Sequence, residues 1–468
     1  MRRRARTACS VIGIVCLIGG LRAQTPPGVA PPQPLSLAQA IDYATEHYPT
    51  LKAAGEQVNA STANIDVARS AYLPRLDSLW QSNRATANNV FGQVFPQPVI
   101  PALSGPVLAS ASSDSVWSSA VGALFSWEPA DFGLRHANVV GADAALLRAK
   151  AGEALTRLEL QAAVANMFLT VVAAERTLVV AQADLDRRTV LRQSIQTLVD
   201  NQLRPGADAS RANAERVAAQ TRVIQAEQNV ALAQISLQRL LGSAPMTTID
   251  GSRLIAGAPP GDLSGAAPAA HPAVQLRDAA VAQARSFETV LAKSDLPRLY
   301  FLASAFARGS GATTTGPFNG GLGGLTLDRA NWAAGFQVVF PNLFDFGTLR
   351  ARKVAAAATT RAESALHDEA ALIVSSQQQG AAALLRSARA IAANTPIQLA
   401  AARQSESQGR ARYDAGLASM TEVADAQAIL AQSEVQDELA RIEVWRALLA
   451  TAVAQGDLTP FLTLIRQP

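Results

Sequence analysis

Leu73-Pro74-Arg75-Leu76 and Leu296-Pro297-Arg298-Leu299 are two copies of one tetrapeptide that lie 223 residues apart. In each copy the proline follows an earlier proline by 25 residues. Proline breaks a helix and restricts the residue before it to extended backbone. Pro74 and Pro297 are therefore predicted to mark junctions at which a helix ends and a strand begins.

Two further landmarks repeat in the same order. Asp131-Phe132-Gly133 recurs as Asp345-Phe346-Gly347, and polar turns begin at Gly206 and Gly416, at offsets of 214 and 210 residues. This order indicates an internal duplication of a unit of roughly 200 residues. We expect each Asp-x-Gly to end a strand and to cap the next helix, with the aspartate as hydrogen-bond acceptor and the glycine in an unusual backbone conformation.

The N-terminus has the pattern of an export signal. A basic stretch with four arginines precedes a short apolar segment, Ala8–Leu21, and Ala23 is the predicted last residue before cleavage. The apolar segment is too short to cross a bilayer, which takes about 20 residues, and we expect no other membrane-spanning helix. Both cysteines, Cys9 and Cys16, lie within the signal peptide, residues 1–23, so the mature chain is expected to lack disulfides.

The composition excludes several classes of function. Without the signal peptide the chain has 36 basic and 37 acidic residues, so its charge gives no indication of nucleic-acid binding. Hydrophobic residues make up 49% of the chain but aromatic residues only 5%, and the abundant alanine favours long, closely packed helices. The four histidines lack metal-ligand spacing, and no catalytic triad or carboxylate pair stands out. We therefore expect no enzyme activity, no cofactor and no metal site.

Each half of the mature chain is predicted to contain a helix, a β-hairpin and a long helical hairpin. The first repeat spans 24–242, with its β-hairpin at 76–130 and its helical hairpin at 134–241. The second repeat spans 271–456, with its β-hairpin at 299–342 and its helical hairpin at 346–454.

The segments outside the repeats are expected to be irregular. They are a connector rich in Gly, Pro, Ser and Ala, 243–270, and a C-terminal segment, 457–468. Within the repeats, the first helix of each helical hairpin is long enough to form a rod of roughly 100 Å. Pro396 is predicted to kink or break the second of these rods.

Aromatic residues gather in the two predicted β-hairpins. Residues 76–132 and 299–346 hold four of the five tryptophans and eleven of the fourteen phenylalanines. Apolar residues alternate there with small or polar ones, and rings lie near the strand ends, as in the aromatic girdles of an outer-membrane β-barrel. The predicted membrane belt consists of Trp80, Trp117, Trp127, Trp332, Phe336 and Phe340.

Four strands cannot close a barrel by themselves. An open sheet edge in lipid leaves backbone groups unsatisfied, at a cost of several kcal/mol each. Closure therefore requires several copies of the chain. Two copies give eight strands and a lumen filled by side chains, whereas three give twelve strands and an aqueous pore. The helical rods that continue from every strand pair must also form a ring, which favours the wider barrel.

The sequence resembles the TolC family of outer-membrane efflux channels over essentially the whole mature chain. The stretches that carry the resemblance are Leu37–Ile41 and His47–Pro49, the two Leu-Pro-Arg-Leu copies, Pro341–Gly347 with Arg350-Ala351, and Arg412–Ser419.

The resemblance implies a mixed α and β membrane protein. Its homotrimer would form a twelve-stranded barrel in the outer membrane, four strands per chain, that continues into an α-helical coiled-coil tunnel in the periplasm. The connector and the C-terminal segment would form a belt around the tunnel. The implied function is the passive channel of a tripartite efflux or type I secretion system. Its partners would be outer-membrane lipid, a periplasmic adaptor and an inner-membrane RND, ABC or MFS transporter.

The resemblance also assigns roles to the turns of the helical hairpins and to the residues beside them. The turn residues expected to dock the adaptor are Gly206, Ala207, Gly416, Leu417, Ala418 and Ser419. Tyr413 matches a position that helps to hold the entrance shut, although Ala418 stands where the best-studied members have arginine.

Acidic residues follow the second turn. Glu422 and Asp425 are three residues apart and share a helix face, and Glu215 occupies the position of Asp425 in the first repeat. In similar channels such residues form a ring that narrows the closed entrance and favours cations. The alternative is an ordinary solvated helix face.

The main alternative from a different class is a soluble periplasmic coiled-coil adaptor or structural protein. That alternative accounts for the rods and the export signal but not for the concentrated aromatic residues. The sequence does not indicate the transported substrate, so drug, metal-ion and polypeptide export all stay open.

Overall fold

The computed structural model describes residues 34–101, 105–109, 111, 113–242, 248–255, 270–314, 322–341 and 346–466. The predicted signal peptide, most of the connector and Asp345 lie outside the described residues. In chain order the elements are α1 (Leu37–His47), α2 (Pro49–Ser70), β1 (Arg75–Thr86), β2 (Ser115–Ala130), α3 (Leu134–Asp200), α4 (Gly206–Leu240), α5 (Ser252–Ile255), α6 (Pro272–Lys293), β3 (Arg298–Ser310), the 3₁₀ turn η2 (Gly323–Leu325), β4 (Arg329–Val339), α7 (Phe346–Asp414), α8 (Met420–Gln455) and α9 (Thr459–Arg466).

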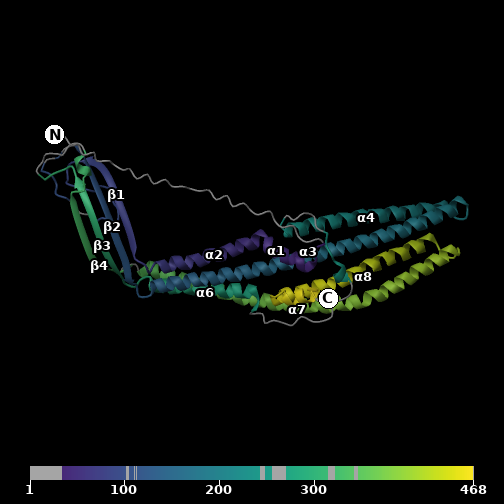
Figure 1. Cartoon of the computed structure of the whole chain (residues 1–468). Helices are drawn as coiled ribbons and strands as arrows, with labels where there is room; N and C mark the ends of the chain where they lie inside the picture. The colour runs from purple at the N-terminus through teal and green to yellow at the C-terminus, as the bar shows by residue number, and fades with distance from the viewer. Residues whose placement is uncertain are drawn as a thin grey trace.

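The molecule is elongated, with the β-sheet at one end and the helices running away from it (Figure 1). The turns that join α3 to α4 and α7 to α8 lie at the end farthest from the sheet, and the C-terminal part of the chain lies near the middle (Figure 1). The two halves of the chain have the same order of elements: α2, β1, β2, α3 and α4 in the first, and α6, β3, β4, α7 and α8 in the second. The long helices α3 and α7 contain 67 and 69 residues.

Both copies of the repeated tetrapeptide join a helix to a strand in the same way. α2 and α6 each contain 22 residues and begin with a proline, Pro49 or Pro272, whose missing N–H costs nothing in the first helical turn. Each helix ends a few residues before the second proline, and the strands begin at Arg75 and Arg298, directly after Pro74 and Pro297. The prolines thus stand at the change from helical to extended backbone.

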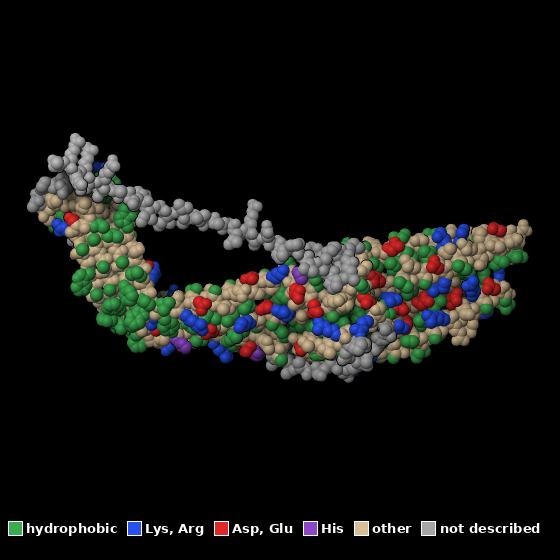
Figure 2. All heavy atoms as spheres, viewed as in Figure 1, with side chains coloured by type: hydrophobic (Ala, Val, Ile, Leu, Met, Phe, Trp, Pro, Cys, Tyr) green, Lys and Arg blue, Asp and Glu red, His purple; other side chains and the backbone are tan. Residues whose placement is uncertain are grey.

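The four strands form one antiparallel sheet in the order β1-β2-β3-β4. Leu76 pairs with Phe125, Trp80 pairs with Val121, and Phe301 pairs with Phe336, so these residues lie on one face. That face is exposed in the single chain: Trp80 is 73% accessible and Trp332 81%. The face is apolar, and in Figure 2 the visible side of the sheet carries few charged side chains, whereas the helices carry many.

Most of the predicted belt residues lie toward the two ends of the strands. Trp117 lies toward the loop end of the sheet and Trp127 and Phe336 toward the helix end, with Phe340 just beyond β4. Ten residues separate Trp117 from Trp127, which is about 33 Å along a strand and about 25 Å of height at a strand tilt of about 40°. Trp80 and Trp332 are the exceptions, because Trp80 lies opposite Val121 and Trp332 opposite Ala305, both near the middle of the sheet.

The junction between β2 and α3 is held by a buried ion pair. Asp131 accepts hydrogen bonds from the backbone N–H groups of Gly133 and Arg135 and pairs with the Arg135 guanidinium at 3.2 Å. Gly133 has a φ of 98°, which favours glycine. Arg135 also lies over the ring of Tyr72, 4.7 Å from its centroid, and so ties α3 to the end of α2.

The second junction differs from the sequence expectation. Gly347 lies inside the first turn of α7 with no positive φ, so the unusual backbone angle predicted for both glycines occurs only at Gly133. The reason is that α7 begins two residues earlier in the repeated motif than α3 does, at Phe346 rather than after the glycine. An ordinary helical conformation is then required at Gly347.

The largest hydrophobic core lies at mid-length, where α1, α3, α8 and α9 meet. Trp445 packs against Phe461 with ring centroids 6.2 Å apart, and its indole N–H donates to the carbonyl of Leu254 at 3.1 Å. The connector and the C-terminal segment therefore meet at this core. The C-terminal segment was expected to be irregular, but Phe461 and Ile465 are four residues apart and buried on one side of α9.

Two other expectations need correction. α7 continues past Pro396, so the predicted break does not occur; the proline is exposed, while its neighbour Thr395 is buried and bonds Asp437 of α8 at 3.0 Å. α3 contains an 18-residue stretch with mean hydropathy 1.5 that would allow a membrane span by composition, which the sequence reading did not anticipate. Its residues Val164 and Phe168 are instead fully buried in the mid-length core.

The Asp131 junction predicts a pH-dependent contribution to stability. Burial raises the pKa of Asp131, but the N–H groups of Arg135 and Gly133 and the Arg135 guanidinium outweigh it and lower the pKa below its usual value. A lowered folded-state pKa stabilises the fold above the unfolded-state pKa of about 3.9, and this stabilisation is lost as pH falls through the folded-state pKa. Asp131→Asn should therefore lower the free energy of unfolding by about 1–3 kcal/mol at pH 7.

This difference should shrink below about pH 4, where the wild-type carboxylate becomes protonated. Thermal unfolding of purified protein across pH measures it, and Asp66→Asn, an exposed site on α2, is the control. An equal loss of stability at pH 7 and pH 3 would contradict the role of the ionised carboxylate.

Candidate functional site: the tips of the helical hairpins

The two hairpin turns have different backbone geometry. At the second tip, Gly416 has a φ of 73°, and the N–H of Leu417 donates to the carbonyl of Arg412 at 2.8 Å, as in a glycine-terminated helix. At the first tip, Gln202 has the positive φ, 62°, and Gly206 begins α4 with open space around it. The turn therefore requires glycine at Gly416 but not at Gly206.

Tyr413 joins the two tips. Its ring is 1% accessible and packs with Leu191 and Ile195 of α3 and Met420 and Val423 of α8. Its hydroxyl donates to Asp208 of α4 at 3.1 Å.

An arginine from the first tip completes the contact. The guanidinium of Arg204 lies 4.5 Å from the centroid of the Tyr413 ring and donates to the Tyr413 carbonyl. An arginine is therefore present beside this tyrosine although Ala418 provides none. We call Tyr413, Asp208 and Arg204 the tip contact.

The protonation of the tip contact is stable at neutral pH. Burial of Tyr413 raises its pKa above the usual value of 10.0, and the Asp208 carboxylate raises it further. The hydroxyl therefore keeps its proton and remains a donor to Asp208 throughout the neutral range.

The two acidic residues after the second tip have different surroundings. Ser419 and Glu422 form a capping box at the start of α8, and Glu422 also lies 3.8 Å from Arg412. Asp425 is exposed, and the described residues provide no ion-pair partner for it. Glu422 is thus partly neutralised, whereas Asp425 keeps an uncompensated charge.

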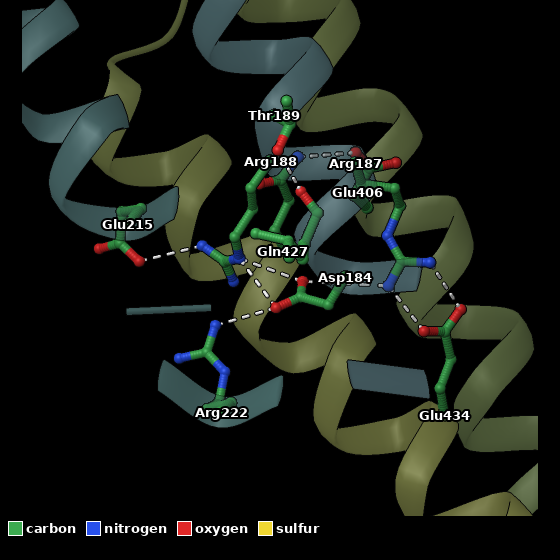
Figure 3. A network of polar contacts seen from close by, with 10 residues as sticks. Asp184, Arg187, Arg188, Thr189, Glu215, Arg222, Glu406, Gln427 and Glu434 are labelled. Carbon is green, nitrogen blue, oxygen red and sulfur yellow. Dashed lines mark hydrogen bonds and ion pairs between the residues drawn. The ribbon is translucent and has the colours of Figure 1, made fainter. Parts of the chain in front are cut away.

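Glu215 belongs to a separate network (Figure 3) and lies about two and a half turns from the start of α4 at Gly206. Asp184 and Arg188 of α3 are buried and paired at 3.0 Å, and Asp184 also binds Arg222 of α4 at 2.9 Å. Arg188 donates to Glu215 at 2.9 Å. Glu215 therefore contacts arginine within its own helical hairpin rather than standing unpaired like Asp425.

A second arm of this network links the two helical hairpins. Arg187 of α3 donates to both carboxylate oxygens of Glu434 of α8, at 3.3 and 2.7 Å (Figure 3). Such two-point pairing fixes geometry as well as adding energy. A cavity of about 410 Å³ lies between the helices beside this network and is lined in part by Asp184, Arg188 and Arg222.

The tips also expose apolar side chains. Leu417 is 72% accessible, and Leu203 at the first tip is 68% accessible. Ala207 and Ser419 are exposed as well, and Ala418 is half-buried. Leu203 was not among the turn residues predicted to dock the adaptor. A leucine within the polar turn Asn201-Gln202-Leu203-Arg204 could have indicated it.

Comparison with known proteins relates this geometry to channels. The family model described as outer membrane efflux protein matches residues 40–243. No curated protein matches the sequence. No group of three or more potential metal-ligating side chains occurs within the described parts of the chain.

Solved structures match almost the whole described chain. The CmeC outer membrane channel of Campylobacter jejuni has 13% identity and a TM-score of 0.73, with 90% of this chain and 85% of that chain covered. The outer membrane protein VceC of Vibrio cholerae has 16% identity and a TM-score of 0.72, with 90% and 96% covered. The MtrE outer membrane channel of Neisseria gonorrhoeae has 18% identity and a TM-score of 0.72, with 90% and 89% covered.

These structures share the fold of this chain, with a sheet that continues into long helical hairpins. The match to the outer membrane efflux protein family covers residues 40–243, and the chain as a whole has the fold of these outer-membrane channels.

Proposed function

We propose that three copies of this chain form a passive channel from the periplasm to the exterior. The observation that carries the proposal is the sheet: it is apolar on one face, and each of its edge strands, β1 and β4, has a single neighbour. In lipid those edges must be paired, and pairing β4 of one copy with β1 of the next satisfies both. Three copies give twelve strands and a lumen wide enough for water.

The helices would continue this barrel as a tunnel. α3 follows β2 directly, and α7 begins a few residues after β4, so a ring of strands imposes a ring of helices. The landmark order in the sequence and the matched element order support an origin by duplication, with 24–242 and 271–456 as the two repeats. The core at mid-length would form a belt around the tunnel.

The tips would form the periplasmic entrance. The tip contact holds the two hairpins of one chain together, and we propose that it keeps the entrance closed at rest. Three copies of Asp425, with Glu422 beside them, would form an acidic ring that favours cations. Glu215, neutralised by Arg188, would contribute little to that ring.

The tips would also meet the partner proteins. Leu203 and Leu417, with Gly206, Ala207, Gly416, Ala418 and Ser419, would receive the helical hairpin of a periplasmic adaptor, because exposed apolar side chains mark interaction sites. An RND, ABC or MFS transporter in the inner membrane would supply the energy. The chain itself would catalyse no reaction.

Fractionation and conductance test this function. The protein should remain with outer membranes in Sarkosyl, and the purified protein should form ion-conducting channels in planar bilayers. Recovery as a soluble periplasmic protein without conductance would contradict the proposal and would favour the coiled-coil adaptor alternative.

The tip contact predicts the effect of removing one hydroxyl. Tyr413→Phe keeps the buried ring beneath Arg204 but loses the hydrogen bond to Asp208, with a net cost of about 1 kcal/mol in the closed state. That cost shifts the equilibrium between closed and open entrances by roughly fivefold per chain toward the open one. Single-channel recordings should show a higher mean conductance or more open time.

The control is Tyr43→Phe, which removes a hydroxyl from a tyrosine stacked on His47 near the mid-length core, far from the tips. Asp208→Ala should act like Tyr413→Phe, because either change removes the same bond. Unchanged recordings for both tip variants would rule out the tip contact as a latch.

A further inference from the structure

The loop between β1 and β2 is not a free surface loop. Two of its residues, Val99 and Ile100, are only 6% and 2% accessible. They form a hydrophobic cluster with Ala120 and Phe306, against which Leu79 and Leu124 also pack. The loop is therefore anchored on three strands at once, β1, β2 and β3.

The anchored face is the one opposite the tryptophans. Leu79, Ala120 and Phe306 each neighbour a residue of the apolar face along their strands, and successive side chains of a strand point to opposite faces. This second face carries Gln81, Asn83, Ser118 and Ser304, and Ser118 donates a hydrogen bond to Asn83 within it. In a barrel with its tryptophans toward lipid, the anchored loop lies on the inside.

The loop reaches deep along the strands. β2 begins at Ser115 on the loop side, and the anchor residues Ala120 and Leu124 lie five and nine residues further. At about 3.3 Å per residue these positions are roughly 16 and 30 Å along the strand. The anchor therefore sits near the middle of the sheet rather than at its rim.

Two glycines make room for the loop. A Cβ atom at Gly122 would lie 2.9 Å from Cγ1 of Ile100 and 2.8 Å from Cβ of Phe306. A Cβ atom at Gly92 in the loop would lie 2.5 Å from Cβ of Arg308 on β3. Since real Cβ atoms do not approach so closely, both contacts depend on glycine, one on the sheet and one on the loop.

The anchored segment is also stiff. The side chain of Gln97 accepts hydrogen bonds from the backbone N–H groups of Val99 and Ile100 and donates to the carbonyl of Ile100 at 2.9 Å. Pro96, Pro98 and Pro101 restrict the backbone on both sides, which lowers the entropy lost when the loop is fixed. Val94 and Phe95, which directly precede Pro96, are exposed, with 44% and 61% of their surfaces accessible.

We propose that residues 91–101 form a fixed constriction inside the barrel, one copy from each chain, which limits passage to small solutes and excludes folded polypeptides. This inference rests on the proposed trimeric channel. The exposed Val94 and Phe95 would give the constriction a partly apolar lining, which suits small, partly apolar solutes. The substrate class is thereby narrowed to small molecules.

The position of the loop is tested by disulfide formation in the full-length protein. Ile100→Cys is paired in turn with Ala120→Cys and with Leu124→Cys; the native cysteines lie in the predicted signal peptide, so the mature chain would carry only the introduced pair. Mild oxidation should close at least one pair. The control pair, Val107→Cys with Leu124→Cys, places its first cysteine at a 75% exposed position of the same loop and should stay reduced. Failure of both Ile100 pairs would overturn the proposal.

The constriction is tested by access from outside the cell. Gln337→Cys lies on the inner face of β4, nearer the helices than the anchor, and is probed on intact cells with maleimide-polyethylene glycol of increasing length. Adding Ile100→Asp places a charge in the apolar anchor and should release the loop. A reagent that is too long to label the single Gln337→Cys variant should then label the double variant as fast as the shortest reagent does. Val107→Asp should leave the size limit unchanged.

An unchanged size limit with Ile100→Asp would overturn the constriction even if the disulfide forms. Absence of labelling by every reagent, with Ile100→Asp as well as without it, would instead contradict the proposed channel. In that case the disulfide pairs still decide whether the loop lies on the inner face.

Discussion

The unpaired edges of the four-stranded sheet constrain the whole molecule. Each chain has one apolar face of suitable height for a membrane, but β1 and β4 each lack a second neighbour. Backbone N–H and C=O groups in lipid must be hydrogen-bonded, so in a membrane other copies of the chain would have to pair with both edges. In the proposed trimer, closure of the sheet would also set the number of helices in the tunnel. The proposed assembly is therefore a consequence of backbone hydrogen bonding.

The long helices must stay aligned with one another along their whole length, although many of their side chains are small. Alanine lets helices approach closely but specifies little about how they align. The ion pairs do specify alignment: Arg187 with Glu434 joins the two hairpins of a chain, and Asp184 with Arg222 joins α3 to α4. At the tips Tyr413 has this role, through its hydrogen bonds with Asp208 and Arg204, its cation–π contact and the packing of its buried ring.

Local patterns predicted the elements better than the contacts between them. Proline at Pro74 and Pro297 acts on its own neighbours, so the strand starts could be read directly from the sequence. The partnership of Arg204 with Tyr413 spans 209 residues and depends on where two turns meet, which no local pattern encodes. The Asp184 network and the packing of Val99 and Ile100 against the sheet were missed for the same reason. α9 was missed because it has only eight residues, too few to show a clear apolar period, although Asp457 and Pro460 mark its start.

The central claim is that three chains close their sheets into one barrel of twelve strands. Native mass spectrometry of the complex extracted from outer membranes tests it most directly. We predict three chains per complex, stable in detergent, with no smaller folded species. A monomer that keeps its sheet, or a dimer, would contradict closure by three copies.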